Sequence, residues 1–142
     1  MLFVDSNIWC YYFDQRLHEH VCVREAMREI ITSEDIACNT IIVMEVAHYI
    51  VRHFTEQIAR KKIEYFVNLS NLQIADFNRI ALNETIESLL LYSFAEGLGG
   101  RDATVIATMK LQNVKKIVSH DAVFRRLADK LELELIDPAQ PS

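Results

Sequence analysis

Apolar residues along the chain follow two patterns, short uninterrupted runs and longer stretches at helical spacing. The run Leu2-Phe3-Val4, which ends at Asp5, is typical of a central strand that is buried on both faces. The longer stretches repeat their apolar positions every three to four residues, as amphipathic helices do. The expected strands cover residues 2–4, 35–38, 72–75, 116–119 and 133–136. The expected helices cover residues 7–13, 20–32, 40–53, 55–69, 78–96, 102–112 and 122–130.

Strands that alternate with helices imply a parallel sheet covered on both faces and joined by right-handed crossovers. Ligands of such sheets bind beyond the carboxyl ends of the strands, where the strand order reverses. The three glycines all lie within residues 97–100 and both prolines lie in the last five residues, so no linker divides the chain. We therefore expect a single α/β domain over residues 1–142.

The expected helix over residues 78–96 has an unusually wide apolar surface. Leu91 and Tyr92 widen it near its C-terminal end, and so broad a face favours a contact between subunits. The residues expected to face the core are Leu82, Ile86, Leu89, Leu90 and Phe94.

Composition places the chain among ordinary globular proteins. Apolar residues make up 51% and charged residues 25%, which excludes a disordered or fibrous chain. The N-terminus has no basic flank, and the apolar runs are far shorter than a membrane span. Cys10, Cys22 and Cys38 are odd in number and lack C-x-x-C spacing, as expected in a reducing cytosol. We expect a cytoplasmic protein without a membrane partner.

The net charge of −5, from 15 basic and 20 acidic residues, normally argues against a nucleic-acid partner. If four carboxylates were gathered around metal ions, their charges would be neutralised, and the net charge of the rest of the chain would change from −5 to −1. The sign of the net charge therefore does not decide the question.

Two aspartates are expected at the same edge of the sheet. Asp5 directly follows the first strand, and Asp121 lies shortly after the apolar Ile117-Val118 of the fourth. Either residue could simply cap the helix that follows it, because an aspartate there accepts from free N–H groups and suits the helix dipole.

Two further acids lie near the starts of helices. Glu45 forms a polar stripe with His48 and Arg52, which either faces solvent or brings Glu45 back over the sheet edge. Asp102 follows the glycine joint, and small residues at positions 103 and 107 permit close packing of its helix on the sheet.

If these four carboxylates converge, their like charges raise one another's pKa unless a cation compensates them. Oxygen-only ligation favours Mg²⁺ or Mn²⁺. Two such ions about 3.5–4 Å apart activate a water and stabilise the leaving oxygen of a phosphodiester. The chemistry suggested is metal-dependent phosphodiester hydrolysis.

Four blocks of the chain share residue types, order and approximate spacing with one family. They are Phe3-Val4-Asp5-Ser6-Asn7, Met44-Glu45-Val46, Arg101-Asp102-Ala103-Thr104-Val105-Ile106-Ala107 and Ile117-Val118-Ser119-His120-Asp121-Ala122-Val123-Phe124. On these blocks the chain resembles the PIN-domain nucleases, and among them the VapC-type ribonuclease toxins of toxin–antitoxin pairs. The resemblance implies a three-layer fold with a five-stranded parallel sheet flanked by helices.

The resemblance also implies a pocket that binds one or two Mg²⁺ or Mn²⁺ ions and cleaves RNA. Asp5 and Asp102 would be the central metal ligands, Glu45 would bind metal or position the attacking water, and Asp121 would complete a second metal site. The expected supporting residues are Ser6, Asn7 and Ser119, of which the two serines could orient a carboxylate or a metal-bound water. Val123 stands where the family often has a further acid, which bears on how tightly a second ion is held.

Such toxins are commonly homodimers, and an antitoxin holds them inactive by covering the pocket. The basic residues nearest the pocket in sequence are Arg101, Arg125 and Arg126, so phosphate contact by at least one of them is expected. Trp9 is expected in the core or a groove wall rather than as a platform for bases.

Several alternatives remain open from sequence. A housekeeping RNA-processing nuclease of the same family is one, and a catalytically idle PIN-like binding module is another. Phospho-acceptor folds fit less well. A dehalogenase-type phosphatase needs an aspartate where Asn7 stands, and Asp76 lacks the paired acids of a receiver domain.

Overall fold

The computed structural model describes residues 1–140, which form five strands and seven helices. The strands are β1 (Leu2–Val4), β2 (Ile36–Asn39), β3 (Leu72–Ala75), β4 (Lys116–Val118) and β5 (Glu134–Ile136). The helices are α1 (Ser6–Phe13), α2 (His20–Ser33), α3 (Thr40–His53), α4 (Glu56–Val67), α5 (Arg79–Glu96), α6 (Gly100–Leu111) and α7 (Ala122–Leu127). The predicted order of strands and helices is confirmed, with shifts only at the ends of elements.

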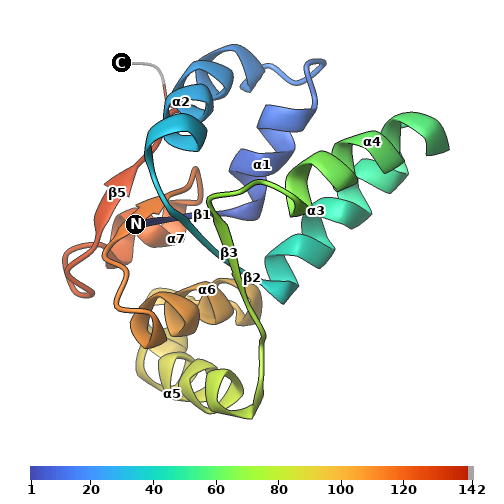
Figure 1. The fold of residues 1–142 in the computed structure, drawn as a ribbon. Helices are drawn as coiled ribbons and strands as arrows, with labels where there is room; N and C mark the ends of the chain where they lie inside the picture. The colour runs from blue at the N-terminus through green and yellow to red at the C-terminus, as the bar shows by residue number, and fades with distance from the viewer. Residues whose placement is uncertain (141–142) are drawn as a thin grey trace.

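All strand pairs are parallel, in the order β3-β2-β1-β4-β5, which confirms the expected α/β fold. The chain runs outward from β1 to β3 and then returns to β4 on the other side of β1. Right-handed crossovers therefore place α1–α4 on one face of the sheet and α5–α7 on the other. Figure 1 shows α5 and α6 across the sheet from α1–α4, and α5 contacts both α6 and α7. The strand order reverses between β1 and β4, so their carboxyl ends form the expected ligand-binding edge.

The core is centred on the two strands β1 and β2 and on α6. Every residue of β1 and β2 is buried, as is every residue from 103 to 109 in α6. Ala103 and Ala107 are fully buried, as expected for the small face of this helix. Trp9 is also fully buried, with its ring centroid 4.7 Å from that of Phe66, so its expected place in the core is confirmed.

The prediction of which α5 residues face inward is wrong for most of them. The buried positions are Ala81, Thr85 and Ser88, because close packing of α5 on α6 requires small side chains. Of the predicted residues, only Leu89 packs partly against the core. The helix therefore exposes a broad row of large apolar side chains, namely Ile80, Leu82, Ile86, Leu90, Leu91 and Phe94. Even so, no helix within residues 1–140 has the length and apolar character needed to cross a membrane.

Candidate active site

Asp5 and Asp121 both cap helices, as their positions in the sequence allow. Asp5 lies between β1 and α1, and its Oδ1 accepts a hydrogen bond of 2.8 Å from the backbone N–H of Ser6. Asp121 precedes α7, and its Oδ1 accepts from the backbone N–H of Val123 at 3.1 Å. Each cap uses the Oδ1 atom of the carboxylate, so the Oδ2 atom of each aspartate can make other contacts.

The buried hydroxyl of Ser119 links these two residues. It donates to Asp5 Oδ2 at 2.8 Å and accepts from the backbone N–H of Asp121 at 3.1 Å. Ser119 thus fixes the orientation of the Asp5 carboxylate, one of the roles expected of it. Ser6 contributes its backbone N–H to the same carboxylate. Asn7 has a buried Oδ1 with no hydrogen-bond partner among residues 1–140.

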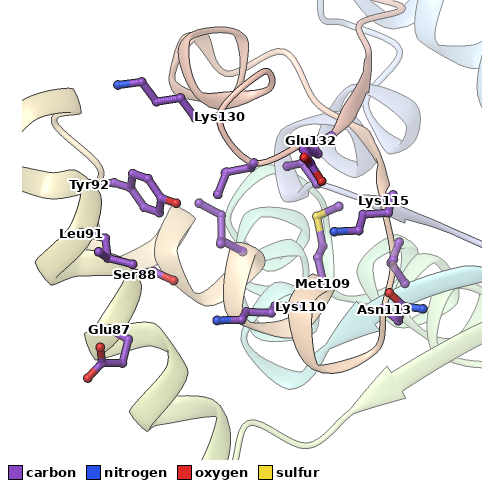
Figure 2. A pocket seen from close by; sticks show the side chains of 14 residues that line it. Glu87, Ser88, Leu91, Tyr92, Met109, Lys110, Asn113, Lys115, Lys130 and Glu132 are labelled. Carbon is purple, nitrogen blue, oxygen red and sulfur yellow. The ribbon is translucent and has the colours of Figure 1, made fainter.

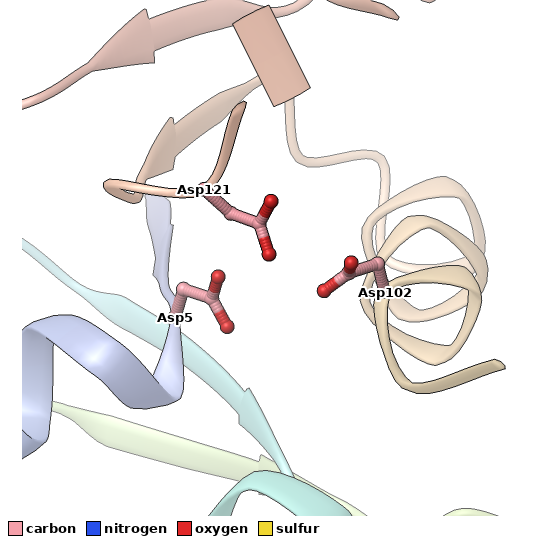
Figure 3. A group of neighbouring side chains, drawn as sticks. All are labelled: Asp5, Asp102 and Asp121. Atoms are coloured by element: carbon pink, nitrogen blue, oxygen red, sulfur yellow. The ribbon is translucent and has the colours of Figure 1, made fainter. Parts of the chain in front are cut away.

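Asp102 reaches the same edge from the opposite layer. Helix α5 ends at Glu96 and is capped by Gly97, whose φ of +72° is a left-handed conformation that glycine adopts without steric cost. Helix α6 then begins at Gly100 and carries Asp102 in its first turn. In Figure 3 the side chains of Asp5, Asp102 and Asp121 point toward one another, and one carboxylate oxygen of each lies within 4.8 Å of the others.

Glu45 lies at the margin of this group and is not a member of the three-aspartate cluster. It projects from α3 and is partly buried. Its Oε2 is 3.3 Å from a guanidinium nitrogen of Arg101, while its Oε1 is buried without a hydrogen-bond partner in the described residues. The structure therefore brings three of the four expected acids together and connects the fourth through an arginine.

Burial and the negative charges of neighbouring acids raise the pKa values of Asp5, Glu45 and Asp102. Burial is the largest cause for Asp5 and for Glu45. The pKa of Asp102 rises to about 6, chiefly through burial and then through the negative charges of Asp121 and Asp5. A carboxylate with a raised pKa is held in its charged form at a cost, which a bound cation would relieve.

Arg101 places a positive charge among the acids. Its guanidinium lies 3.3 Å from Glu45 and 3.6 Å from both Asp102 and Asp121. Burial lowers the pKa of Arg101, but the charges of Glu45 and Asp102 outweigh burial and raise it. The sequence suggested Arg101 only as a phosphate contact. The position of Arg101 immediately before Asp102 in the sequence was the one signal that its charge would lie among the acids.

The other two arginines expected to contact RNA are held by the protein itself. Arg125 donates to Asp137 Oδ2 at 2.8 Å, and Arg126 donates to the backbone carbonyl of Glu96 at 3.1 Å. The Asp137 carboxylate also contacts His120, with a distance of 2.9 Å between Asp137 Oδ2 and His120 Nδ1. Contact of these arginines with phosphate stays a prediction.

The donor set fits a hard divalent cation. Asp102 Oδ1 and Glu45 Oε1 are buried without hydrogen-bond partners in residues 1–140, and such orphaned atoms are rare unless an ion or water satisfies them. The converging ligand atoms are all carboxylate oxygens, which Mg²⁺ and Mn²⁺ prefer. Asp5, Asp102 and Asp121 are therefore the residues that could hold a metal, with Glu45 beside them.

A pocket of about 370 Å³ lies away from these acids, between α5, α6 and the segment before β5. Figure 2 shows Leu91, Tyr92 and Met109 around it, together with Lys110 and Lys130. The four expected acids are not among its lining residues, so this pocket is separate from the acidic site.

Comparisons with known proteins agree with the fold. A family model described as PIN domain matches residues 2–130, whereas no curated protein matches the chain. Among solved structures, the chain is similar to VapBC2 from Rickettsia felis, which is bound to a promoter DNA fragment. The two chains are 19% identical with a TM-score of 0.71, and the match covers 96% of this chain and 98% of that chain. It is also similar to VapC20 from Mycobacterium tuberculosis, described as a sarcin-ricin loop cleaving toxin, with 13% identity, a TM-score of 0.73, and coverage of 89% and 94%. FitAcB from Neisseria gonorrhoeae shows 15% identity, a TM-score of 0.72, and coverage of 99% and 100%. At these identities the likeness is one of fold.

Proposed function

The chain belongs to the PIN-domain family, and on that premise we propose that it is an endoribonuclease that depends on Mg²⁺ or Mn²⁺. The observation that carries the proposal is the convergence of three aspartates from separate elements, with one oxygen of each within 4.8 Å of the others. They meet at the edge of the sheet where the strand order reverses, which is where folds of this kind bind ligands.

The proposal assigns a role to each of the four acids. One or two bound ions would polarise the scissile phosphate and supply a water of lowered pKa. In this proposal Asp5, oriented by Ser119, and Asp102, whose Oδ1 accepts no hydrogen bond within residues 1–140, are the central ligands. Asp121 completes a second metal site, and Glu45 binds metal or positions the attacking water.

Two supporting residues lie next to Asp5. Ser6 holds the Asp5 carboxylate through its backbone N–H, and the buried Oδ1 of Asn7 is available to accept a hydrogen bond from a metal-bound water. The substrate phosphates are contacted by one or more of the arginines expected to bind RNA, namely Arg101, Arg125 and Arg126.

We further propose that this nuclease is the toxin of a type II toxin–antitoxin pair and acts in the cytoplasm. The structural neighbours support an antitoxin partner, since one is described as a toxin–antitoxin complex from Klebsiella pneumoniae. The exposed apolar row of α5 supports a homodimer, because monomeric proteins rarely leave so continuous an apolar surface uncovered.

RNA cleavage by purified protein tests the enzymatic part of this proposal. Wild-type protein should cut RNA with Mg²⁺ or Mn²⁺ and lose the activity in excess chelator. Asp5→Asn and Asp102→Asn should each reduce the rate by about a hundredfold or more, because they remove central metal ligands. Asp35→Asn, which changes an exposed aspartate outside the site, should leave the rate unchanged.

The outcomes separate the alternatives. Cleavage that persists in chelator, or that survives Asp5→Asn, would overturn the proposed mechanism. Binding of Mn²⁺ without cleavage would instead indicate an idle PIN-like binding module. Growth arrest on expression, relieved by a small upstream reading frame, would distinguish a toxin from a housekeeping RNA-processing nuclease.

A further inference from the structure

The guanidinium of Arg101 contacts the same carboxylates that the proposed metal ions need. Resting on the proposed metal site, we propose that Arg101 is a built-in competitor of the divalent ions. In the metal-free protein its charge compensates the three acids that it contacts. It must move away from them before they become metal ligands.

The contact distances describe a shared cation rather than a locked ion pair. Arg101 lies 3.3 Å from Glu45 and 3.6 Å from both Asp102 and Asp121, whereas strong charge-assisted hydrogen bonds of arginine measure about 2.7–2.9 Å. The guanidinium is thus held by several long contacts. Each of them is individually weak, so a small multivalent cation has little to displace at any one oxygen.

The surroundings also give the side chain a way out. The Arg101 side chain is 48% exposed, while the side chains of Asp102 and Asp121 are 14% and 26% exposed. The arginine therefore reaches the acids from the solvent side, and it can turn outward without disturbing the backbone of α6. The hydrogen bond of the Asp121 cap does not depend on Arg101, and Asp102 is a short side chain on the first turn of α6, so both carboxylates remain at the sheet edge when the arginine leaves.

Simultaneous occupation is electrostatically unfavourable. A divalent ion at the Asp102 and Asp121 oxygens would lie close to a guanidinium that touches the same oxygens, and like charges at such distances repel. The two cations therefore exclude each other. The displaced arginine, facing solvent beside the pocket, is then free to contact a substrate phosphate.

The test is a calorimetric titration of the whole protein with Mn²⁺ alone. We expect Arg101→Gln to bind Mn²⁺ about tenfold more tightly than wild type, because partly exposed ion pairs each change an equilibrium constant by only a few-fold. Tenfold corresponds to about 1.4 kcal/mol. Arg60→Gln is the matched control, since Arg60 carries the same charge but pairs with Glu56 on α4, away from the pocket. Its Mn²⁺ affinity should stay within about twofold of wild type at moderate salt.

Two further measurements keep the test decisive. Arg101→Lys retains the positive charge on a compact ammonium, so its Mn²⁺ affinity should lie between wild type and Arg101→Gln. Circular dichroism and thermal unfolding check that each variant is folded. Metal-free Arg101→Gln should melt at a lower temperature than wild type, and Mn²⁺ should raise its melting temperature by more.

Failure of this inference is distinguishable from failure of the proposed function. Mn²⁺ binding that Asp102→Asn abolishes, but that Arg101→Gln leaves equal or weakens, overturns the competition and leaves the metal site standing. If wild type and Arg101→Gln both bind no Mn²⁺ at millimolar concentration, the metal site and the competition are both overturned.

Discussion

Asp102 offers a direct test of whether the acidic site lowers the stability of the metal-free protein. Asp102→Asn keeps the shape of the side chain and removes its charge. We expect this variant to lose metal binding and cleavage but to be more stable than wild type in the absence of metal. The reason is that burial and the charges of Asp121 and Asp5 raise the pKa of Asp102 to about 6, so folding penalises the charged carboxylate.

The expected gain follows from that pKa. A rise from 3.8 to about 6 corresponds to about 3 kcal/mol at neutral pH, before screening is considered. Solvent reaches part of the carboxyl group, and the guanidinium of Arg101 at 3.6 Å offsets part of the repulsion. We therefore expect a gain of about 1–2 kcal/mol in the free energy of unfolding. A change of this size is readily measured against a typical total of about 5–15 kcal/mol.

The gain should depend on pH in a defined direction. Because its pKa is raised, Asp102 holds its proton more tightly in the folded protein than in the unfolded chain. The penalty is therefore absent below about pH 3.8 and complete above about pH 6. Denaturant unfolding in chelator should show Asp102→Asn more stable than wild type at neutral pH, with a difference that shrinks toward pH 4.

Asp35→Asn supplies the control, since this exposed aspartate should change stability by no more than about 0.5 kcal/mol. Adding Mn²⁺ should stabilise wild type and leave Asp102→Asn unchanged, because only a protein that binds the ion gains from it. If the asparagine variant is no more stable than wild type in chelator, or keeps its whole advantage at pH 4, the explanation by burial and repulsion is refuted.

Three further changes test other parts of the structure. Ser119→Ala removes the hydrogen bonds to Asp5 and from Asp121. It should lower the free energy of unfolding in denaturant by about 1–3 kcal/mol and weaken Mn²⁺ binding about 10–100-fold. An unchanged Mn²⁺ affinity would show that Ser119 does not orient Asp5. Tyr49→Phe removes the 2.6 Å hydrogen bond to Asp14 and should cost about 1–2 kcal/mol at neutral pH. Hydrogen bonds from Arg16 and Tyr49 hold the pKa of Asp14 well below its usual value of 3.8. The stabilisation that Tyr49 gives should therefore be fully present above pH 3.8 and decline below it, as measured by thermal melts of both proteins. A stability difference between wild type and Tyr49→Phe that does not change with pH would contradict this reasoning. Leu90→Lys, in the exposed row of α5, should convert a dimer to a monomer in sedimentation experiments, whereas Val21→Lys on α2 should not; identical sedimentation of both variants would place the subunit contact elsewhere.

The sequence predicted best those site residues whose position depends on the backbone alone. Asp5 and Asp121 follow parallel strands that are neighbours in the sheet, so their convergence is a consequence of topology. Asp102 depends on a helix start that Gly97 and the small face of α6 bring against the sheet. Short side chains on fixed backbone positions leave little freedom, which is why these three could be expected to meet.

The contacts of longer side chains were harder to predict from the sequence. Glu45 and Arg101 reach the site through several rotatable bonds, so spacing along the chain does not determine what their end groups contact. The helical pattern of α5 failed for a different reason. Large apolar residues cover several sides of this helix, and the buried side is selected by how closely α6 must approach, which is a property of the neighbouring helix.

Asp5 and Asp121 both cap helices, and the capping role alone does not account for their charge. Serine and asparagine cap helices about as well as aspartate and carry no charge. Two aspartates with carboxylate oxygens within 4.8 Å of each other, one of the two side chains buried with a raised pKa, are a more costly solution than capping requires. The added cost is explained if a cation binds between them, so the closeness of the two carboxylates, rather than either cap, is what favours a metal site.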